Sequence, residues 1–90
     1  MKAVGIRVTG RVQGVSYRAW TRQEARGLGL AGWVRNAEDG SVRAHVEGPE
    51  DAVDQLLSRL RTGPAFAQVR EVAATPAEPQ GLSGFEIHRG

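Results

Sequence analysis

The chain has 90 residues, of which 40% are hydrophobic and 24% charged, and its formal net charge is +2. This length allows one compact domain, residues 1–90, and excludes a second. The chain contains no cysteine, which excludes disulfides, thiolate metal sites and a cysteine nucleophile. No apolar run reaches the roughly 20 residues of a membrane-spanning helix, so we expect a soluble, cytoplasmic protein with no membrane partner.

The first third of the chain predicts a strand, a glycine loop and a helix. Residues 4–9 alternate apolar with polar or small side chains, which is the period of a half-buried strand. Residues 10–16 contain two glycines and end in Ser16, a residue suited to capping a helix over about 17–28.

The middle of the chain predicts a hairpin followed by a second helix. Residues 31–36 indicate a short strand, and the turn at 37–40 ends in Asp-Gly, which favours a hairpin. Residues 42–47 alternate again, and residues 49–61 carry an apolar stripe with acidic residues at its start and arginines near its end.

Residues 68–75 and 85–87 predict two more strands, joined by a loop over 76–84. The element order is therefore β-α-β-β-α-β plus a short terminal strand. Each of the two helices has one apolar stripe, and the strands alternate. An antiparallel sheet with both helices on one face buries all of these apolar surfaces together. We predict an α+β fold, a ferredoxin-like two-layer sandwich.

The segment over residues 10–18, Gly-Arg-Val-Gln-Gly-Val-Ser-Tyr-Arg, is a candidate anion site. Backbone N–H groups in such a turn converge on one point, and a helix N-terminus adds partial positive charge. Arg18 in the first helical turn adds a planar fork of donors that matches phosphate. Taken alone, a glycine loop is more often a simple connection, and Asn36, the only asparagine, is by itself a common turn residue.

The string GRVQGVSYR closely resembles the signature of the acylphosphatase family, a loop of the type GxVQGVxFR that ends in a phosphate-binding arginine. Residues 32–36, Gly-Trp-Val-Arg-Asn, resemble the family's second signature, whose closing asparagine positions the attacking water. The element order and residues 84–87 also look like the family's fold and last strand, so the resemblance covers essentially the whole chain. Tyr17 stands where phenylalanine is usual, and Ser16 fills a variable position.

The resemblance implies an enzyme that hydrolyses acyl phosphates to carboxylate and inorganic phosphate. Its implied site consists of Arg18, Asn36 and the backbone amides of Gln13, Gly14, Val15, Ser16, Tyr17 and Arg18. Because a carboxylate leaves readily, water can attack phosphorus directly without a metal, another cofactor or a covalent intermediate. We expect a monomer that binds a small-molecule acyl phosphate and is competitively inhibited by inorganic phosphate.

Other signals favour structural roles. Residues 27–32 match the dinucleotide pattern G-x-G-x-x-G, but they end a helix and enter a strand, which reverses the required order. His45 and His88 occupy strand positions that alternate with apolar ones, so we expect them to face solvent. Helix-dipole complementation accounts for the carboxylates near the second helix start, Glu47, Glu50, Asp51 and Asp54.

Three other functions compete with hydrolysis. Eleven arginines are spread from Arg7 to Arg89 without a block of like charge, so we expect no nucleic-acid partner. A non-enzymatic ferredoxin-like module, either a regulatory ligand-binding domain or an RNA binder of the RRM type, is the main alternative. The second is disfavoured because the predicted central strands carry no aromatic pattern for base stacking. A domain of a larger maturation factor is the third possibility, against which the length argues.

Overall fold

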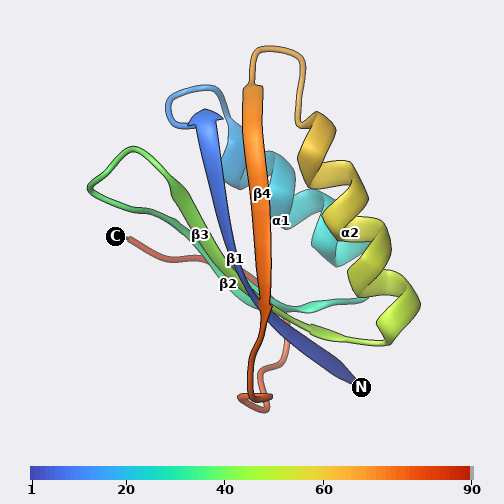
Figure 1. Cartoon of the computed structure of the whole chain (residues 1–90). Coiled ribbons are helices and arrows are strands. Elements are labelled where there is room, and N and C mark those ends of the chain that lie inside the picture. Colours follow the sequence, from blue (N-terminus) through green and yellow to red (C-terminus); the bar gives the residue numbers. More distant parts are fainter. Residues whose placement is uncertain (90) are drawn as a thin grey trace.

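The computed structural model describes residues 1–89 and contains a five-stranded sheet with two helices on one face (Figure 1). In chain order the elements are β1 (Lys2–Arg11), α1 (Tyr17–Gly27), β2 (Ala31–Asn36), β3 (Val42–Gly48), α2 (Glu50–Thr62), β4 (Gln68–Pro76) and β5 (Phe85–Ile87). The predicted ferredoxin-like sandwich is confirmed. Within residues 1–89, neither helix has the length and apolar character needed to cross a membrane.

The sheet has the strand order β4-β1-β3-β2-β5 and is mixed. The four longer strands pair antiparallel, as expected, but β5 runs parallel to β2, with Ile87 opposite Val34. The reason is the path of the chain after β4. Residues 77–84 carry it from the β4 edge to the β2 edge, so β5 starts at the end of the sheet where β4 finished and runs back along β2 (Figure 1).

The core lies between the sheet and the helices. Val4, Ile6 and Val8 of β1 point into it, and each is at most 4% exposed. The core-facing stripe of α2, Val53, Leu56 and Leu60, is buried against them. Burying a side chain of this size contributes about 1.5–3 kcal/mol, so this layer holds both helices against the sheet.

Tyr17 joins the start of α1 to the end of α2. Its ring is 1% exposed, and its hydroxyl donates a 2.7 Å hydrogen bond to the carbonyl oxygen of Leu60. This bond satisfies the hydroxyl that distinguishes tyrosine from the phenylalanine usual in the family signature. Burial raises the pKa of Tyr17 well above its ordinary range.

Glu47 anchors the segment that crosses the face of the sheet opposite the helices. Its carboxylate accepts hydrogen bonds from the backbone N–H groups of Gln80 and Leu82, 2.7 and 2.9 Å long. The Nε2 of His45 lies 2.7 Å from the same carboxylate. These bonds, of which the one from the Gln80 amide has the largest effect, lower the pKa of Glu47 to about 2. The carboxylate is therefore ionised and accepts the hydrogen bond that the His45 imidazole donates.

Two expectations are therefore wrong. His45 does not face solvent but is only 4% exposed, because residues 77–84 cover its end of the sheet. Glu47 does not complement the dipole of α2 but binds backbone amides far along the chain. Both positions alternate with apolar residues as expected, yet the alternation alone does not reveal that a later segment covers the polar face.

Glu47→Gln should lower the free energy of unfolding by about 2 kcal/mol near neutral pH. The glutamine amide keeps one acceptor oxygen, but its NH₂ group is a donor and cannot accept a hydrogen bond from a backbone N–H group. The melting temperature should fall by roughly 10 °C. The pKa of Glu47 is depressed from its ordinary 4.5, so its contribution is complete above about pH 4.5 and is lost as the pH falls toward 2.

Thermal melts of both proteins between neutral pH and about pH 3 measure this effect. The difference between wild type and variant should narrow in acid. A difference that stays constant over the whole range would show that the ionised carboxylate is not what holds the crossing segment.

Candidate active site

The loop between β1 and α1 is held at both ends and exposed in the middle. Val12 and Tyr17 are each 1% exposed and fix the loop to the core. Between them, Gly14 (φ 74°) and Ser16 (φ 65°) are exposed and take left-handed backbone conformations. Left-handed residues within a turn occur in the backbone nests that bind anions, because they aim successive N–H groups to one side.

Ser16 stands at the N-cap of α1, as predicted, but it does not cap the helix. Its backbone is left-handed, and its side chain makes no capping hydrogen bond. The first turn of α1 also contains no acidic residue, whereas that of α2 contains Glu50 and Asp51. The N–H groups at the start of α1 are therefore not bound by the Ser16 side chain or by an acidic side chain of the first turn, and they can bind an external anion.

Arg18 lies in the first turn of α1 beside this loop. Together with Gly14, Ser16 and Tyr17 it lines a small cavity of about 170 Å³, whose far wall includes Ile87 of β5. Within residues 1–89, Arg18 forms no ion pair with a carboxylate. A guanidinium at a cavity without a carboxylate partner, next to helix N–H groups, favours an anionic ligand.

Asn36 is the last residue of β2, and its Oδ1 atom is buried without a hydrogen-bond partner in the described part of the chain. It follows Val34 by two residues, so both lie on the face that α1 covers. Val34 lies opposite Ile87, which places Asn36 just beyond the strand pair that reaches the cavity. Asn36 itself is not among the residues that line the cavity, but it lies at the same end of the sheet.

The side chain of Gln13 connects the loop to the turn that follows Asn36. Its Nε2 donates hydrogen bonds to the carbonyl oxygens of Ala37 and Ser41, each 2.9 Å long. The sequence predicted only the backbone amide of Gln13 as a functional group, and nothing in the sequence signalled this second role. The side chain joins the two halves of the site, which come from segments more than 20 residues apart.

Asp39 stiffens the turn that Gln13 holds. Its Oδ1 accepts hydrogen bonds from the hydroxyl and backbone N–H of Ser41 at 2.6 and 2.9 Å, and its Oδ2 accepts one from Arg7 at 3.0 Å. These bonds, those from Ser41 first, hold the pKa of Asp39 well below its ordinary range. The turn is therefore a defined structure against which the loop can be positioned.

The only other buried side-chain oxygen without a partner in residues 1–89 is Thr21 Oγ1. Thr21 lies one turn into α1 on its core face and does not line the cavity at the loop. Of these two oxygens in residues 1–89, Asn36 Oδ1 is the one that lies at the loop's end of the sheet. An acceptor there is suited to a small donor such as water.

The chain is similar to known proteins over nearly its whole length. A family model described as Acylphosphatase matches residues 4–87. An acylphosphatase of Rhizobium meliloti (strain 1021) is 50% identical over 90 residues, which cover 99% of this chain and 95% of the relative. One from Rhodospirillum rubrum is 49% identical, covering 94% and 93% respectively.

Solved structures give the same result. The crystal structure of acylphosphatase from Bacillus subtilis matches with a TM-score of 0.95 and 37% identity, covering 98% of this chain and 99% of that one. An acylphosphatase from Coxiella burnetii matches with a TM-score of 0.93 and 32% identity, covering 97% and 92%. The HypF protein of T. kodakarensis matches with a TM-score of 0.83 and 32% identity, but the match covers only 12% of that chain.

The matched range, residues 4–87, spans the glycine loop, Arg18 and Asn36 of this chain. The chain therefore belongs to the acylphosphatase family.

Proposed function

We propose that this chain hydrolyses acyl phosphates to carboxylate and inorganic phosphate by direct attack of water on phosphorus. Arg18 and the loop amides hold the phosphoryl group, and Asn36 orients the water. Membership of the acylphosphatase family supports the overall reaction. The observation that carries the mechanism is the buried Oδ1 of Asn36, which has no partner within residues 1–89.

The phosphoryl group binds at the start of α1. Backbone amides from Gln13 to Arg18 and the Arg18 guanidinium donate to its oxygens, where negative charge increases as the reaction proceeds. The loop is fixed at both ends by buried side chains, so these donors need little reorganisation during the reaction. The uncapped, acid-free first turn of α1 supports this placement.

Asn36 acts on the nucleophile. A carbonyl oxygen can only accept a hydrogen bond, so Oδ1 binds a water proton and turns a lone pair of that water toward phosphorus. The new bond joins the water oxygen to phosphorus, and the bond between phosphorus and the acyl oxygen breaks with its electron pair leaving on the carboxylate. A phosphoryl oxygen accepts the proton that the water loses.

The chemistry of the leaving group explains why the proposal assigns no metal, cofactor or covalent intermediate. A carboxylate needs little protonation to depart, so positioning and charge stabilisation supply the catalysis. Ser16 is exposed in the loop and is the side chain that a covalent mechanism would use. We further propose that the chain acts as a monomer in the cytoplasm and that inorganic phosphate, as product, competes with substrate.

Alanine substitution of Asn36 should separate catalysis from folding. Hydrolysis of benzoyl phosphate by Asn36→Ala should fall about 10²–10³-fold in kcat. The melting temperature should stay the same or rise, because Oδ1 makes no hydrogen bond that folding would lose. Ser16→Ala is the matched loop control and should retain activity, as should wild type in the presence of a chelator. A substantial loss of activity in either control would contradict direct hydrolysis by water.

Removal of Arg18 should abolish both turnover and phosphate binding. Inorganic phosphate should inhibit wild type competitively and raise its melting temperature, since it binds only the folded protein. Arg18→Ala should show no such increase and should lose about 10³-fold in kcat/KM. A variant that is still stabilised by phosphate as strongly as wild type would place the phosphoryl site elsewhere.

Gln13 should behave as a positioning residue. In Gln13→Ala the backbone amide remains, but the turn after Asn36 is released, so kcat should fall about tenfold while phosphate inhibition changes little. Gln55→Ala, at an exposed position of α2, is the matched control and should behave as wild type. Equal losses of kcat and of phosphate affinity would show that the side chain shapes the phosphate loop instead.

A further inference from the structure

Three arginines form a row across the face of the sheet that the helices do not cover. Arg7 of β1 lies opposite Arg43 of β3, and Arg43 lies opposite Arg35 of β2. Like charges directly opposite one another on neighbouring strands destabilise a sheet. Asp39 pairs with Arg7 at 3.0 Å, but within residues 1–89 neither Arg35 nor Arg43 has a carboxylate partner. Arg35 and Arg43 thus bring positive charge to this face without an ion pair in the fold, which suggests that they serve a ligand.

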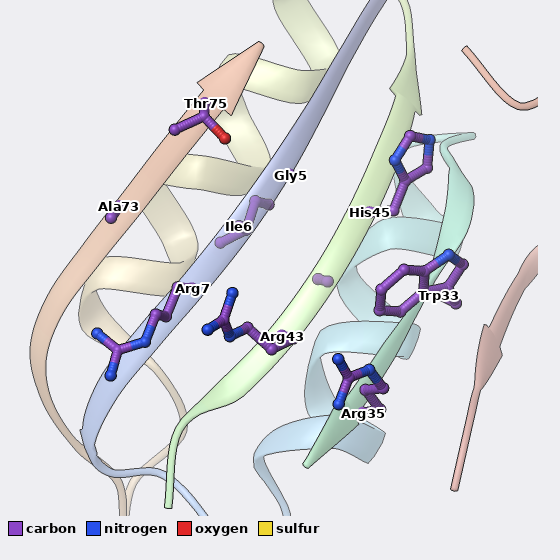
Figure 2. Close-up of a pocket in the computed structure, with 10 residues that line it drawn as sticks. Gly5, Ile6, Arg7, Trp33, Arg35, Arg43, His45, Ala73 and Thr75 are labelled. Atoms are coloured by element: carbon purple, nitrogen blue, oxygen red, sulfur yellow. The ribbon is translucent and has the colours of Figure 1, made fainter. Parts of the chain in front are cut away.

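A flat aromatic row lies next to the arginines. Trp33 of β2 lies opposite His45 of β3, and His45 lies opposite Gly5 of β1, which has no side chain. The ring planes of Trp33 and His45 are 21° apart with centroids at 6.3 Å, and those of Trp33 and His88 are 13° apart with centroids at 5.5 Å. Figure 2 shows the indole broadside to the viewer, in front of the sheet, with Arg35 beside it.

The two rows together line a shallow hollow of about 380 Å³. Consecutive rows on one face are two residues apart, or about 7 Å, and a row of three strands spans about 10 Å. The guanidinium carbon of Arg35 lies 5.8 Å from the centre of the Trp33 ring, so a cation and an aromatic surface adjoin each other. The hollow thus presents several phosphate-binding groups beside one ring on which a planar group can stack.

Charged groups of both signs surround the hollow. Arg70 lines a neighbouring hollow together with Arg7 and Gly10, which gives four guanidinium groups with the three of the row. Four carboxylates stand against them. Asp39 pairs with Arg7, and Glu71 lies opposite Thr9, one row beyond Arg7. Glu47 is bound by His45 and two backbone amides, and Glu86, opposite Trp33, pairs with Arg26. Arg35 and Arg43, which have no carboxylate partner within residues 1–89, fit a ligand with more than one negative group.

We propose that this face of the sheet binds a short single-stranded nucleic acid, with phosphates at the arginine row and one base stacked on Trp33. Arginine clusters next to aromatic side chains are how proteins hold single strands, since every base has a face that can stack. A duplex offers no free base to Trp33. This proposal differs from the expectation of no nucleic-acid partner, because strand pairing gathers arginines that are far apart in the sequence.

The surface is separate from the candidate active site. Neither Arg18 nor any residue of the phosphate loop lines this hollow, and none of the row residues lines the cavity at Arg18. Binding there and hydrolysis at the loop can therefore be tested independently. Failure of one proposal leaves the other standing.

The test is fluorescence anisotropy with a labelled oligothymidylate of about eight nucleotides that carries no terminal phosphate. At low ionic strength wild type should bind with a dissociation constant on the order of 10⁻⁵ M, and binding should weaken with salt. Arg43→Ala should weaken binding several-fold and reduce the slope of log affinity against log salt by about 0.7. Trp33→Leu should weaken it about tenfold with little change in slope.

Two charge controls keep the test specific. Arg61→Ala removes an exposed arginine from α2, and Arg18→Ala removes the one at the loop; both should bind the oligonucleotide within about twofold of wild type. Arg43→Ala should keep its benzoyl phosphate turnover. Because Arg43 is exposed and makes no ion pair within residues 1–89, its removal leaves the core unchanged.

Three outcomes would overturn the proposal. Either charge control could weaken binding as much as Arg43→Ala, which would indicate attraction by the overall charge or by the phosphate loop. A duplex of the same length could bind as tightly as the single strand. Trp33→Leu, shown to be folded by circular dichroism, could bind as well as wild type.

Discussion

The pairing register of β1 determines both faces of this molecule. Strand β1 lies between β3 and β4, and its side chains alternate between the helix-covered core and the open face. A slip of one residue would exchange the two sets and place Arg7 among the core valines. The same register fixes the end of β1, from which the glycine loop begins. The core, the loop and the arginine row thus all follow from one set of backbone hydrogen bonds.

Gly10 is where β1 leaves this register. The pairing with β4 shifts between Thr9 and Gly10, and Gly10 takes a φ of 117°. A Cβ atom there would lie 2.3 Å from the carbonyl oxygen of Gln68, so no other residue fits without moving backbone. The bulge turns the chain out of the sheet just before Val12 enters the core. The first glycine of the loop signature is therefore explained by packing against β4, before any contact with a ligand.

Local patterns in the sequence predicted most of the fold. The alternation in residues 4–9 and 42–47 and the apolar stripe of α2 each gave an element of the correct type, because each element buries one face. The parallel pairing of β5 and the burial of His45 were not predictable in this way, since both depend on the path of residues 77–84 across the sheet. Hydrogen bonds between distant segments leave no periodic signal.

The candidate site was predictable to the extent that it is contiguous. Residues 10–18 form one stretch, and Arg18 lies where the motif placed it, at the start of α1. The side-chain role of Gln13 and the isolation of Asn36 Oδ1 required the tertiary structure, because both concern the contact between the loop and the β2–β3 turn. The arginine row likewise arises only when three strands are placed side by side.

The short strand β5 also protects the sheet from other chains. It occupies the edge of β2, whose N–H and C=O groups would otherwise be open to pairing. β5 spans only three residues, and the middle of the segment before it, at Gln80 and Leu82, is fastened by one carboxylate. Opening of this C-terminal portion would cost less than unfolding the whole domain. Such opening would add the edge of β2 to the edge of β4, which has no outer neighbour in the described sheet, as a place for pairing with another chain, and acid, by weakening the Glu47 anchor, would favour it.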